Sequence, residues 1–233
     1  METKTGKETI DDVRGRQKDS ILAFSRGKDS IAAWLSIRDS FDKIVPYFLY
    51  SVPGLEFVEN SITYFEKFFD IKIIQLPHPS THRKLNNLVF QAPQNCAVIE
   101  QAKLPNFNYE DIRQAVVQIS GIDPETFVAD GVRAADSPMR RLAISTHGSV
   151  SYSQKKYHPV WDMKKQEMVD LFKHHGVKLP IDYKLFGRSF DGMDLRFLLP
   201  LKKHLPNDYK RILDFFPLAD LEIFRWEKSH GKC

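Results

Sequence analysis

The chain has 233 residues, of which 42% are hydrophobic and 27% are charged, and its formal net charge is +4. These values are ordinary for a globular protein, and the chain is long enough to bury a sizeable core. This net positive charge is too small for a protein whose main role is to coat nucleic acid. It suits an anionic small ligand or a nucleic-acid substrate equally well.

Cysteine usage and the N-terminal sequence indicate the compartment. Cys96 and Cys233 alone cannot form a disulfide framework, and no zinc or iron–sulfur spacing is present. The first twenty residues contain no apolar core, so they do not read as a signal peptide. The longest apolar runs are far short of a membrane span. We therefore expect a cytoplasmic protein with no membrane partner.

The predicted elements alternate between strands and helices. Residues 1–18 form a polar segment, with a short helix over 9–18. Continuous apolar runs or β-rich runs predict strands at 20–24, 45–50, 71–76 and 127–130. Helices are predicted between them, with apolar faces from Ile31 to Phe41 and from Phe57 to Phe69.

Strands alternating with helices predict right-handed crossovers and a parallel sheet. The expected fold class is therefore α/β, a Rossmann-like (HUP-type) mostly parallel sheet of about five strands flanked by helices. We assign residues 19–190 to this domain, with a Pro-interrupted helical insertion at about 80–120 that includes a helix over 109–120. A further helix is predicted from an Asp162 cap to His175, with Gly176 as its stop. Residues 191–233 are expected to form a helical C-terminal extension.

The segment Ser25-Arg-Gly-Lys-Asp-Ser30 connects the first strand to the first helix of this domain. A helix start leaves backbone N–H groups without intrahelical partners and carries partial positive charge, and both features favour phosphate. Gly27 allows close approach, Lys28 adds positive charge, and Asp29 is a candidate for capping the helix or holding Mg²⁺. A Walker A loop is excluded, because Leu22 and Asp29 stand where its first Gly and its Ser or Thr belong.

The loop resembles the PP-loop, Ser-Gly-Gly-x-Asp-Ser, of the adenine nucleotide α-hydrolase superfamily, which includes ATP pyrophosphatases and phosphoadenylyl-sulfate (PAPS) reductases. Arg26 replaces the second residue of that motif, Gly, a departure that either crowds the phosphate or adds a contact to it. Two later segments resemble the PAPS reductase-like branch, Gly54-Leu-Glu-Phe57 and Gly131-Val-Arg-Ala-Ala-Asp-Ser-Pro-Met-Arg-Arg141. His158-Pro-Val-Trp161 and Leu179-Pro-Ile-Asp-Tyr183 also match in order, with Trp161 and Tyr183 interpreted as packing residues.

The resemblance implies a nucleotide site at the carboxyl ends of the strands, where open α/β sheets bind ligands. The predicted catalytic residues are Lys28, Asp29 and Arg133, with Cys233 added only if the protein is a reductase. The predicted nucleotide-binding residues are Ser25, Arg26, Gly27, Lys28, Asp29, Ser30, Gly54, Gly131, Arg133 and Arg140. ATP or PAPS is the expected substrate nucleotide, with Mg²⁺ at Asp29 as a possibility and neither zinc nor an iron–sulfur cluster.

The C-terminal residues depart from the reductase pattern. That branch carries a Cys in a Glu-Cys-Gly-hydrophobic-His motif, whereas this chain ends Glu227-Lys-Ser-His-Gly-Lys-Cys233. Cys96 has no placed base in the sequence that would make it a nucleophile. His174 and His175 are interpreted through the dipole of the helix they end. His78 and His82, close to the end of the third predicted strand, are candidates for ligand contact.

Three functions remain open on the sequence alone. The favoured one is an ATP pyrophosphatase that transfers an adenylyl group, acting at the nucleotide phosphates. The second is a PAPS or adenylyl-sulfate reductase-like enzyme. The third is a catalytically decayed nucleotide-binding partner or regulator in sulfur transfer or nucleic-acid modification. A protein partner or nucleic-acid acceptor is open, with the pairs at 155–156, 164–165 and 202–203 as candidate backbone contacts. The oligomeric state is not predicted.

Overall fold

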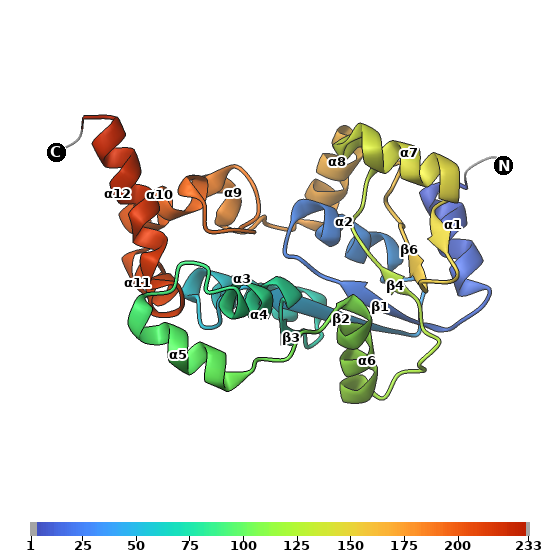
Figure 1. Ribbon diagram of the computed structural model, residues 1–233. Helices are drawn as coiled ribbons and strands as arrows, with labels where there is room; N and C mark the ends of the chain where they lie inside the picture. Colours follow the sequence, from blue (N-terminus) through green and yellow to red (C-terminus); the bar gives the residue numbers. More distant parts are fainter. Residues whose placement is uncertain (1–3, 232–233) are drawn as a thin grey trace. The chain divides into compact units, whose positions relative to one another are not determined.

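The computed structural model describes residues 4–231, and within them the strands form one six-stranded sheet (Figure 1). Its order is β3-β2-β1-β4-β6-β5. The strands are β1 (Asp19–Ala23), β2 (Lys43–Tyr50), β3 (Ile74–Pro77), β4 (Val128–Ala129), β5 (Val150–Ser151) and β6 (Lys156–Tyr157). β1 pairs in parallel with β2 and β4, and β4 pairs in parallel with β6, so the predicted mostly parallel α/β fold is confirmed.

The antiparallel pair β5–β6 is the part of the sheet that the sequence did not predict. Each of its strands has two residues, which is too short for a hydrophobic period to be read. Its place at the edge brings Tyr157 next to Ala129 of β4 and so extends the parallel sheet beyond β4. It also sets the residues after β4 and β6 side by side, which matters for the site below.

The chain divides into two compact units. The first comprises residues 1–48, 66–75 and 113–179, and the second comprises residues 49–65, 76–112 and 180–233. The helices of the first unit are α1 (Gly6–Arg14), α2 (Lys28–Ile37), α7 (Pro138–His147) and α8 (Lys165–His175). Two helices, α3 (Glu56–Phe69) and α6 (Tyr109–Ser120), contribute residues to both units.

The core of the first unit explains why β1 is a continuous apolar run. Ile21 and Leu22 are fully buried, and Phe24 and Trp34 both contact the ring of Phe69. The Trp34 and Phe69 rings stack with their centroids 4.3 Å apart. Burial of large side chains on both faces of β1 fixes the position of the loop that follows it.

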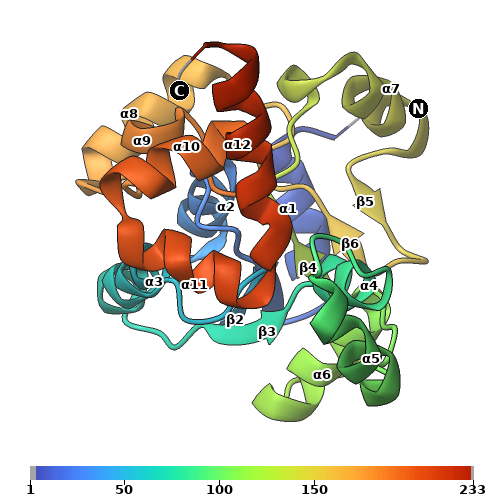
Figure 2. The same ribbon diagram turned by 60° about the vertical axis from the view of Figure 1, so that its left-hand side comes forward.

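The second unit is helical and has its own aromatic core. Its further helices are α4 (Pro79–Asn86), α5 (Pro93–Ala102), α9 (Asp182–Phe186), α10 (Leu195–His204), α11 (Pro206–Phe215) and α12 (Asp220–Ser229). The rings of Phe57, Phe186, Phe190 and Phe197 contact one another, and α10 packs against α11 and α12 (Figure 2). Buried Asp208 accepts hydrogen bonds from the N–H groups of Glu56 and Phe57, at the start of α3. Burial raises the pKa of this carboxyl.

Two helix predictions differ from the structure at their starts. The N-terminal helix begins at Gly6 rather than at residue 9, because Thr5 and Glu8 form a reciprocal cap there. Asp162 does not cap α8, and that prediction was wrong. α8 begins at Lys165, with the Lys164 N–H donating to Glu167, while Asp162 accepts from the N–H of Gly6. The predicted end of α8 at Gly176 is confirmed, as is the predicted helix over 109–120.

Candidate functional site

The candidate site lies in the first unit, where the loop after β1 meets the turn after β4. Within the sheet, β2 and β3 lie on one side of β1, and β4 lies on the other side of β1. The strand order therefore reverses between β1 and β4. Crevices at the carboxyl ends of strands form at such switch points, because the two connections run away from each other.

The loop after β1 is held by its two serines. The Ser30 hydroxyl donates to the carbonyl oxygen of Gly27 at 2.9 Å, and the Ser25 hydroxyl and N–H both approach Ser30 Oγ, at 3.1 and 3.2 Å. Gly27 is the N-cap of α2, so the first turn of the helix begins at Lys28. Ser30 is buried, whereas Ser25 is exposed. Ser30 therefore organises the loop, and Ser25 is the hydroxyl that a ligand can reach.

Arg26 occupies the position at which the motif has glycine. Its φ is +61°, in the left-handed region where glycine is favoured and other residues are strained. Its side chain is 1% exposed, and the guanidinium carbon lies 5.2 Å from the ring centroid of Phe48. The side chain is directed into the protein, so we expect any contact of Arg26 with a ligand to come from its backbone N–H.

The turn after β4 packs directly on the start of α2. A Cβ atom added to Gly131 would lie 2.6 Å from the carbonyl carbon of Asp29 and 2.7 Å from the nitrogen of Ser30. No side chain fits in that space without moving backbone. Glycine at this position is thus required by the contact between the two connections rather than by its own backbone conformation.

A chain of alternating charges joins the two connections. The Lys28 ammonium lies 2.7 Å from Asp29 Oδ2, and Arg133 Nε lies 2.7 Å from Asp29 Oδ1. Arg133 continues to Asp136 at 2.9 Å, and Asp136 to Arg140 at 2.9 Å. Three cations alternate with two carboxylates, so the group carries one net positive charge that suits an anionic ligand.

Arg133 is the best-held member of this chain. It is 5% exposed, and its Nη1 donates to the carbonyl oxygen of Met163 at 3.2 Å. Its Nε contact with Asp29 is short but poorly aligned for a hydrogen bond, so charge attraction rather than bond geometry holds it. Arg140 is exposed and reaches the group through Asp136. Lys28 and Arg140 are therefore the cations that a ligand can reach most directly.

The remaining predicted residues lie elsewhere. Gly54 belongs to the second unit, has φ +74° and faces the Arg211 guanidinium. Cys96 lies in α5 of that unit, with Sγ 3.5 Å from the carbonyl oxygen of Ala92. Cys233 falls outside the described residues. Within residues 4–231, no group of three or more His, Cys, Asp or Glu side chains is arranged to hold a metal ion. Mg²⁺ at Asp29 stays a prediction.

The two candidate histidines of the insertion have structural contacts. His78 is the N-cap of α4, where Nδ1 accepts from the N–H of Ser80, and burial lowers its pKa. His82 Nδ1 lies 2.9 Å from the carbonyl oxygen of Pro105. Trp161 Nε1 donates to the carbonyl oxygen of Lys4 at 2.9 Å, and the interpretation of Trp161 as a packing residue stays a prediction.

A pair that the sequence reasoning did not single out lies at the same edge of the sheet. His158 Nδ1 is 2.6 Å from Asp130 Oδ1, at the carboxyl ends of β6 and β4. Since Asp130 directly precedes Gly131, the pair adjoins the turn that packs on α2. Only the parallel pairing of β4 with β6 brings the two side chains together, and β6 was not predicted.

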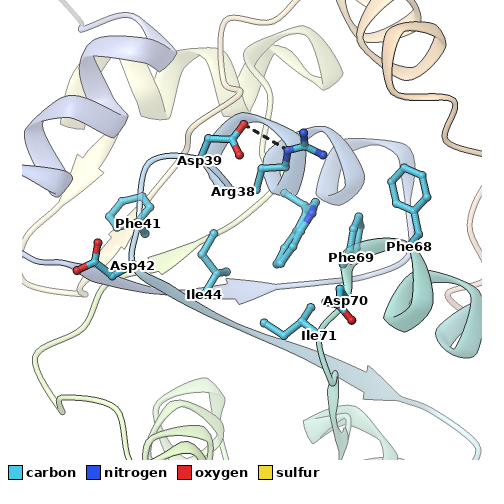
Figure 3. Close-up of a pocket in the computed structure, with 10 residues that line it drawn as sticks. Arg38, Asp39, Phe41, Asp42, Ile44, Phe68, Phe69, Asp70 and Ile71 are labelled. Atoms are coloured by element: carbon cyan, nitrogen blue, oxygen red, sulfur yellow. Dashed lines mark hydrogen bonds and ion pairs between the residues drawn. The ribbon is translucent and has the colours of Figure 1, made fainter.

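A cavity of about 340 Å³ lies at the C-terminal end of α2, away from Lys28 (Figure 3). Its lining includes Arg38, Asp39 and Ile44, near the end of α2 and the start of β2. The Arg38 guanidinium and the Asp39 carboxylate form an ion pair on one side of it. α2 has ten residues and is therefore about 15 Å long, at 1.5 Å per residue. This cavity is thus separate from the loop at Lys28.

Comparisons with known proteins found distant structural neighbours only. No family model and no curated protein matches the chain. Solved structures that resemble it include the U34-tRNA thiolase NcsA from Methanococcus maripaludis with its 4Fe–4S cluster, at 14% identity and a TM-score of 0.46, covering 92% of this chain and 78% of that one. Another is the NH3-dependent NAD synthetase from Campylobacter jejuni in complex with the nitrate ion, at 11% identity and a TM-score of 0.45, covering 94% and 92%.

A third structure is a "predicted subunit of tRNA methyltransferase" from Methanocaldococcus jannaschii, at 15% identity and a TM-score of 0.34, covering 81% of this chain and 87% of that one. Identities and scores this low carry no information about substrate. Among residues 4–231, no helix combines the length and the apolar character needed to cross a membrane.

Proposed function

We propose that the protein binds an adenine nucleotide by its phosphates at the junction of the two connections and transfers the adenylyl group to an acceptor, releasing pyrophosphate. The observation that carries the proposal is the contact of the Gly131 turn with the start of α2, clamped by the Asp29–Arg133 ion pair. Adenine is proposed as the base because Ser25–Ser30 resembles the PP-loop of enzymes that act on adenine nucleotides. The acceptor is not identified, and nucleic acid is one candidate class.

The chemistry follows from the residues at the junction. The N–H groups of the first turn of α2 lack intrahelical partners and can donate hydrogen bonds to anionic oxygens. Lys28 turns from Asp29 toward the phosphates when Mg·ATP binds, and its charge offsets the negative charge that develops on the departing pyrophosphate. Arg133 keeps Asp29 in place, and Arg140 adds an exposed guanidinium. Mg²⁺, when bound with the nucleotide, would supply charge neutralisation near Asp29.

Isothermal titration calorimetry with ATP, AMP, adenylyl sulfate and PAPS, each with and without Mg²⁺, tests the proposal. Mg·ATP is expected to bind, and Lys28→Ala to weaken that binding at least tenfold, because one charge-assisted phosphate contact is lost. Lys43→Ala is the matched control, since Lys43 lies at the other end of the sheet, at the start of β2. Absence of binding by every adenine nucleotide would refute the proposal.

A second candidate function is a nucleotide-binding partner or regulator without turnover. The observation that favours it is the pairing of Asp29 with both Lys28 and Arg133, which leaves its carboxylate engaged on two sides. Binding of Mg·ATP without release of pyrophosphate over a broad acceptor set would support it. The reductase alternative requires thiolate attack on sulfur, and full activity retained by a Cys96→Ser, Cys233→Ser double variant would eliminate it.

A further inference from the structure

The Asp130–His158 pair is built into the sheet edge. Ala129 of β4 and Tyr157 of β6 are partners in the parallel register, and the Asp130 N–H donates to the carbonyl oxygen of Tyr157 at 3.2 Å. The residues that follow these two partners, Asp130 and His158, therefore lie side by side. His158 Nδ1 and Asp130 Oδ1 are 2.6 Å apart as a result.

Both members of the pair are fixed by further contacts. Asp130 Oδ1 also accepts from the N–H of Val132 at 2.9 Å, and the His158 N–H donates to the carbonyl oxygen of Ser149 at 3.0 Å. The His158 side chain is 20% exposed and that of Asp130 is 25% exposed, so a ligand can reach them. The two side chains are thus held in place without being sealed from solvent.

We propose that His158 is the proton acceptor for the acceptor group in the proposed adenylyl transfer, and that Asp130 is its positioning residue. The inference rests on the proposed function. An aspartate that accepts from Nδ1–H fixes the neutral tautomer with its lone pair on Nε2 and stabilises the imidazolium that forms on protonation. Nε2 is the ring nitrogen left to face a ligand.

The position of the pair matches this role. Gly131, next to Asp130, packs on the backbone of Asp29 and Ser30, so the pair lies beside the helix start that is proposed to hold the phosphates. Arg133, three residues after Asp130, contacts Asp29. A proton acceptor is therefore placed at the same carboxyl-end edge as the cations.

The step balances in atoms and charge. A lone pair on the acceptor oxygen or nitrogen forms a bond to the α-phosphorus of ATP. The bond from that phosphorus to the bridging oxygen of the β-phosphate breaks, and its electron pair leaves with pyrophosphate. The proton of the acceptor group passes to His158 Nε2. No oxidant, reductant or further reactant is required.

The test uses Mg·ATP with water as the acceptor, because the natural acceptor is unidentified. His158→Gln and Asp130→Asn are compared with the wild type and with His147→Gln, an exposed histidine near the end of α7. Calorimetry measures Mg·ATP binding, and AMP formation is followed with enzyme in excess. His158→Gln is expected to bind Mg·ATP within threefold of the wild type and to form AMP at least 100-fold more slowly, the usual range for loss of a general base. His147→Gln is expected to match the wild type.

A spectroscopic measurement distinguishes a positioning role of Asp130 toward His158 from a purely structural role. Long-range ¹H–¹⁵N NMR spectra of the wild type are expected to show His158 as the Nδ1–H tautomer, and Asp130→Asn to shift it toward the Nε2–H tautomer and slow AMP formation. Asp130→Glu is expected to recover part of the rate. If His158→Gln fails to fold, the wild-type tautomer and the Asp130 variants still decide the question.

Each other outcome has a definite meaning. An unchanged rate in His158→Gln or an Nε2–H tautomer in the wild type overturns the inference and leaves the proposed function standing. Mg·ATP binding with no AMP formed by the wild type overturns the transfer step of the proposed function, and the inference with it. Absence of Mg·ATP binding by the wild type instead overturns the proposed function, and the inference with it. Calorimetry, the wild-type rate of AMP formation and the His158→Gln rate together tell the two failures apart.

Discussion

Asp29 and Arg133 are 104 positions apart in the chain, yet Oδ1 of the first lies 2.7 Å from Nε of the second. The contact joins the helix start after β1 to the turn after β4. Because Arg133 is buried and also contacts Asp136 and the carbonyl oxygen of Met163, its loss would leave Asp29 with Lys28 alone and Asp136 with Arg140 alone. The geometry of the candidate site depends on this ion pair.

Arg133→Met is therefore expected to destabilise the fold by about 1–3 kcal/mol, since the carbonyl oxygen of Met163 loses its donor and Asp29 and Asp136 each lose one of their two cations. In a double-mutant cycle with Asp29→Asn, the coupling energy should be about 1–3 kcal/mol, measured by urea unfolding. The exposed pair Arg225–Glu222, 2.9 Å apart on α12, is the matched control and should couple by less than about 1 kcal/mol. Equal coupling in the two pairs would contradict the role given to Arg133.

Gly131→Ala is expected to displace the start of α2. The added Cβ would lie 2.6 Å from the carbonyl carbon of Asp29, so backbone must move, at a cost of about 1–3 kcal/mol for overpacking. Mg·ATP affinity should fall at least tenfold in calorimetry. Gly15→Ala is the control, because its Cβ would meet no atom closer than 3.5 Å and should leave affinity unchanged. Wild-type affinity in Gly131→Ala would show that the contact does not shape the site.

The left-handed backbone of Arg26 predicts an inverted preference between two small residues. Arg26→Gly should be more stable than Arg26→Ala by about 1–2 kcal/mol, because both lose the contact with Phe48 but only alanine keeps the strain at φ +61°. At Arg38, where φ is −55°, the order should reverse, with alanine the more stable. Thermal unfolding of the four variants measures both differences. The same order at both positions would refute the strain at Arg26.

Tyr157 predicts a loss of stability at alkaline pH. Burial raises the pKa of its hydroxyl, which lies 2.7 Å from Ser20 Oγ. The unfolded state loses this proton near pH 10 and the folded state retains it, so the unfolded state binds fewer protons above that pH. The free energy of unfolding should then fall by about 1.4 kcal/mol per pH unit from this group alone.

Urea unfolding of Tyr157→Phe between pH 9 and 11 tests this expectation. The variant should lose about 1 kcal/mol at neutral pH with the hydrogen bond, and its stability should decline less steeply with pH than that of the wild type. Tyr152→Phe, at an exposed position, should decline as the wild type does. Parallel curves for Tyr157→Phe and the wild type would count against a buried, protonated hydroxyl.

The local elements of this protein follow from short-range patterns in its sequence. The apolar run before Ser25, the helical spacing after it and the Gly-Val-Arg turn at 131–133 depend on near neighbours, so the strand–loop–helix unit and the parallel α/β fold could be predicted. The helix over 109–120 and the stop at Gly176 were local in the same sense.

The contacts between these elements depend on the three-dimensional packing of the chain. The inward direction of Arg26, the contact of Gly131 with Asp29 and the pairing of Arg133 with Asp29 join residues far apart in sequence. The Asp130–His158 pair depends on the register of a two-residue strand, which has no periodic signal. Strand register and long-range ion pairs are set by packing of the whole unit, and a pattern along the chain does not contain them.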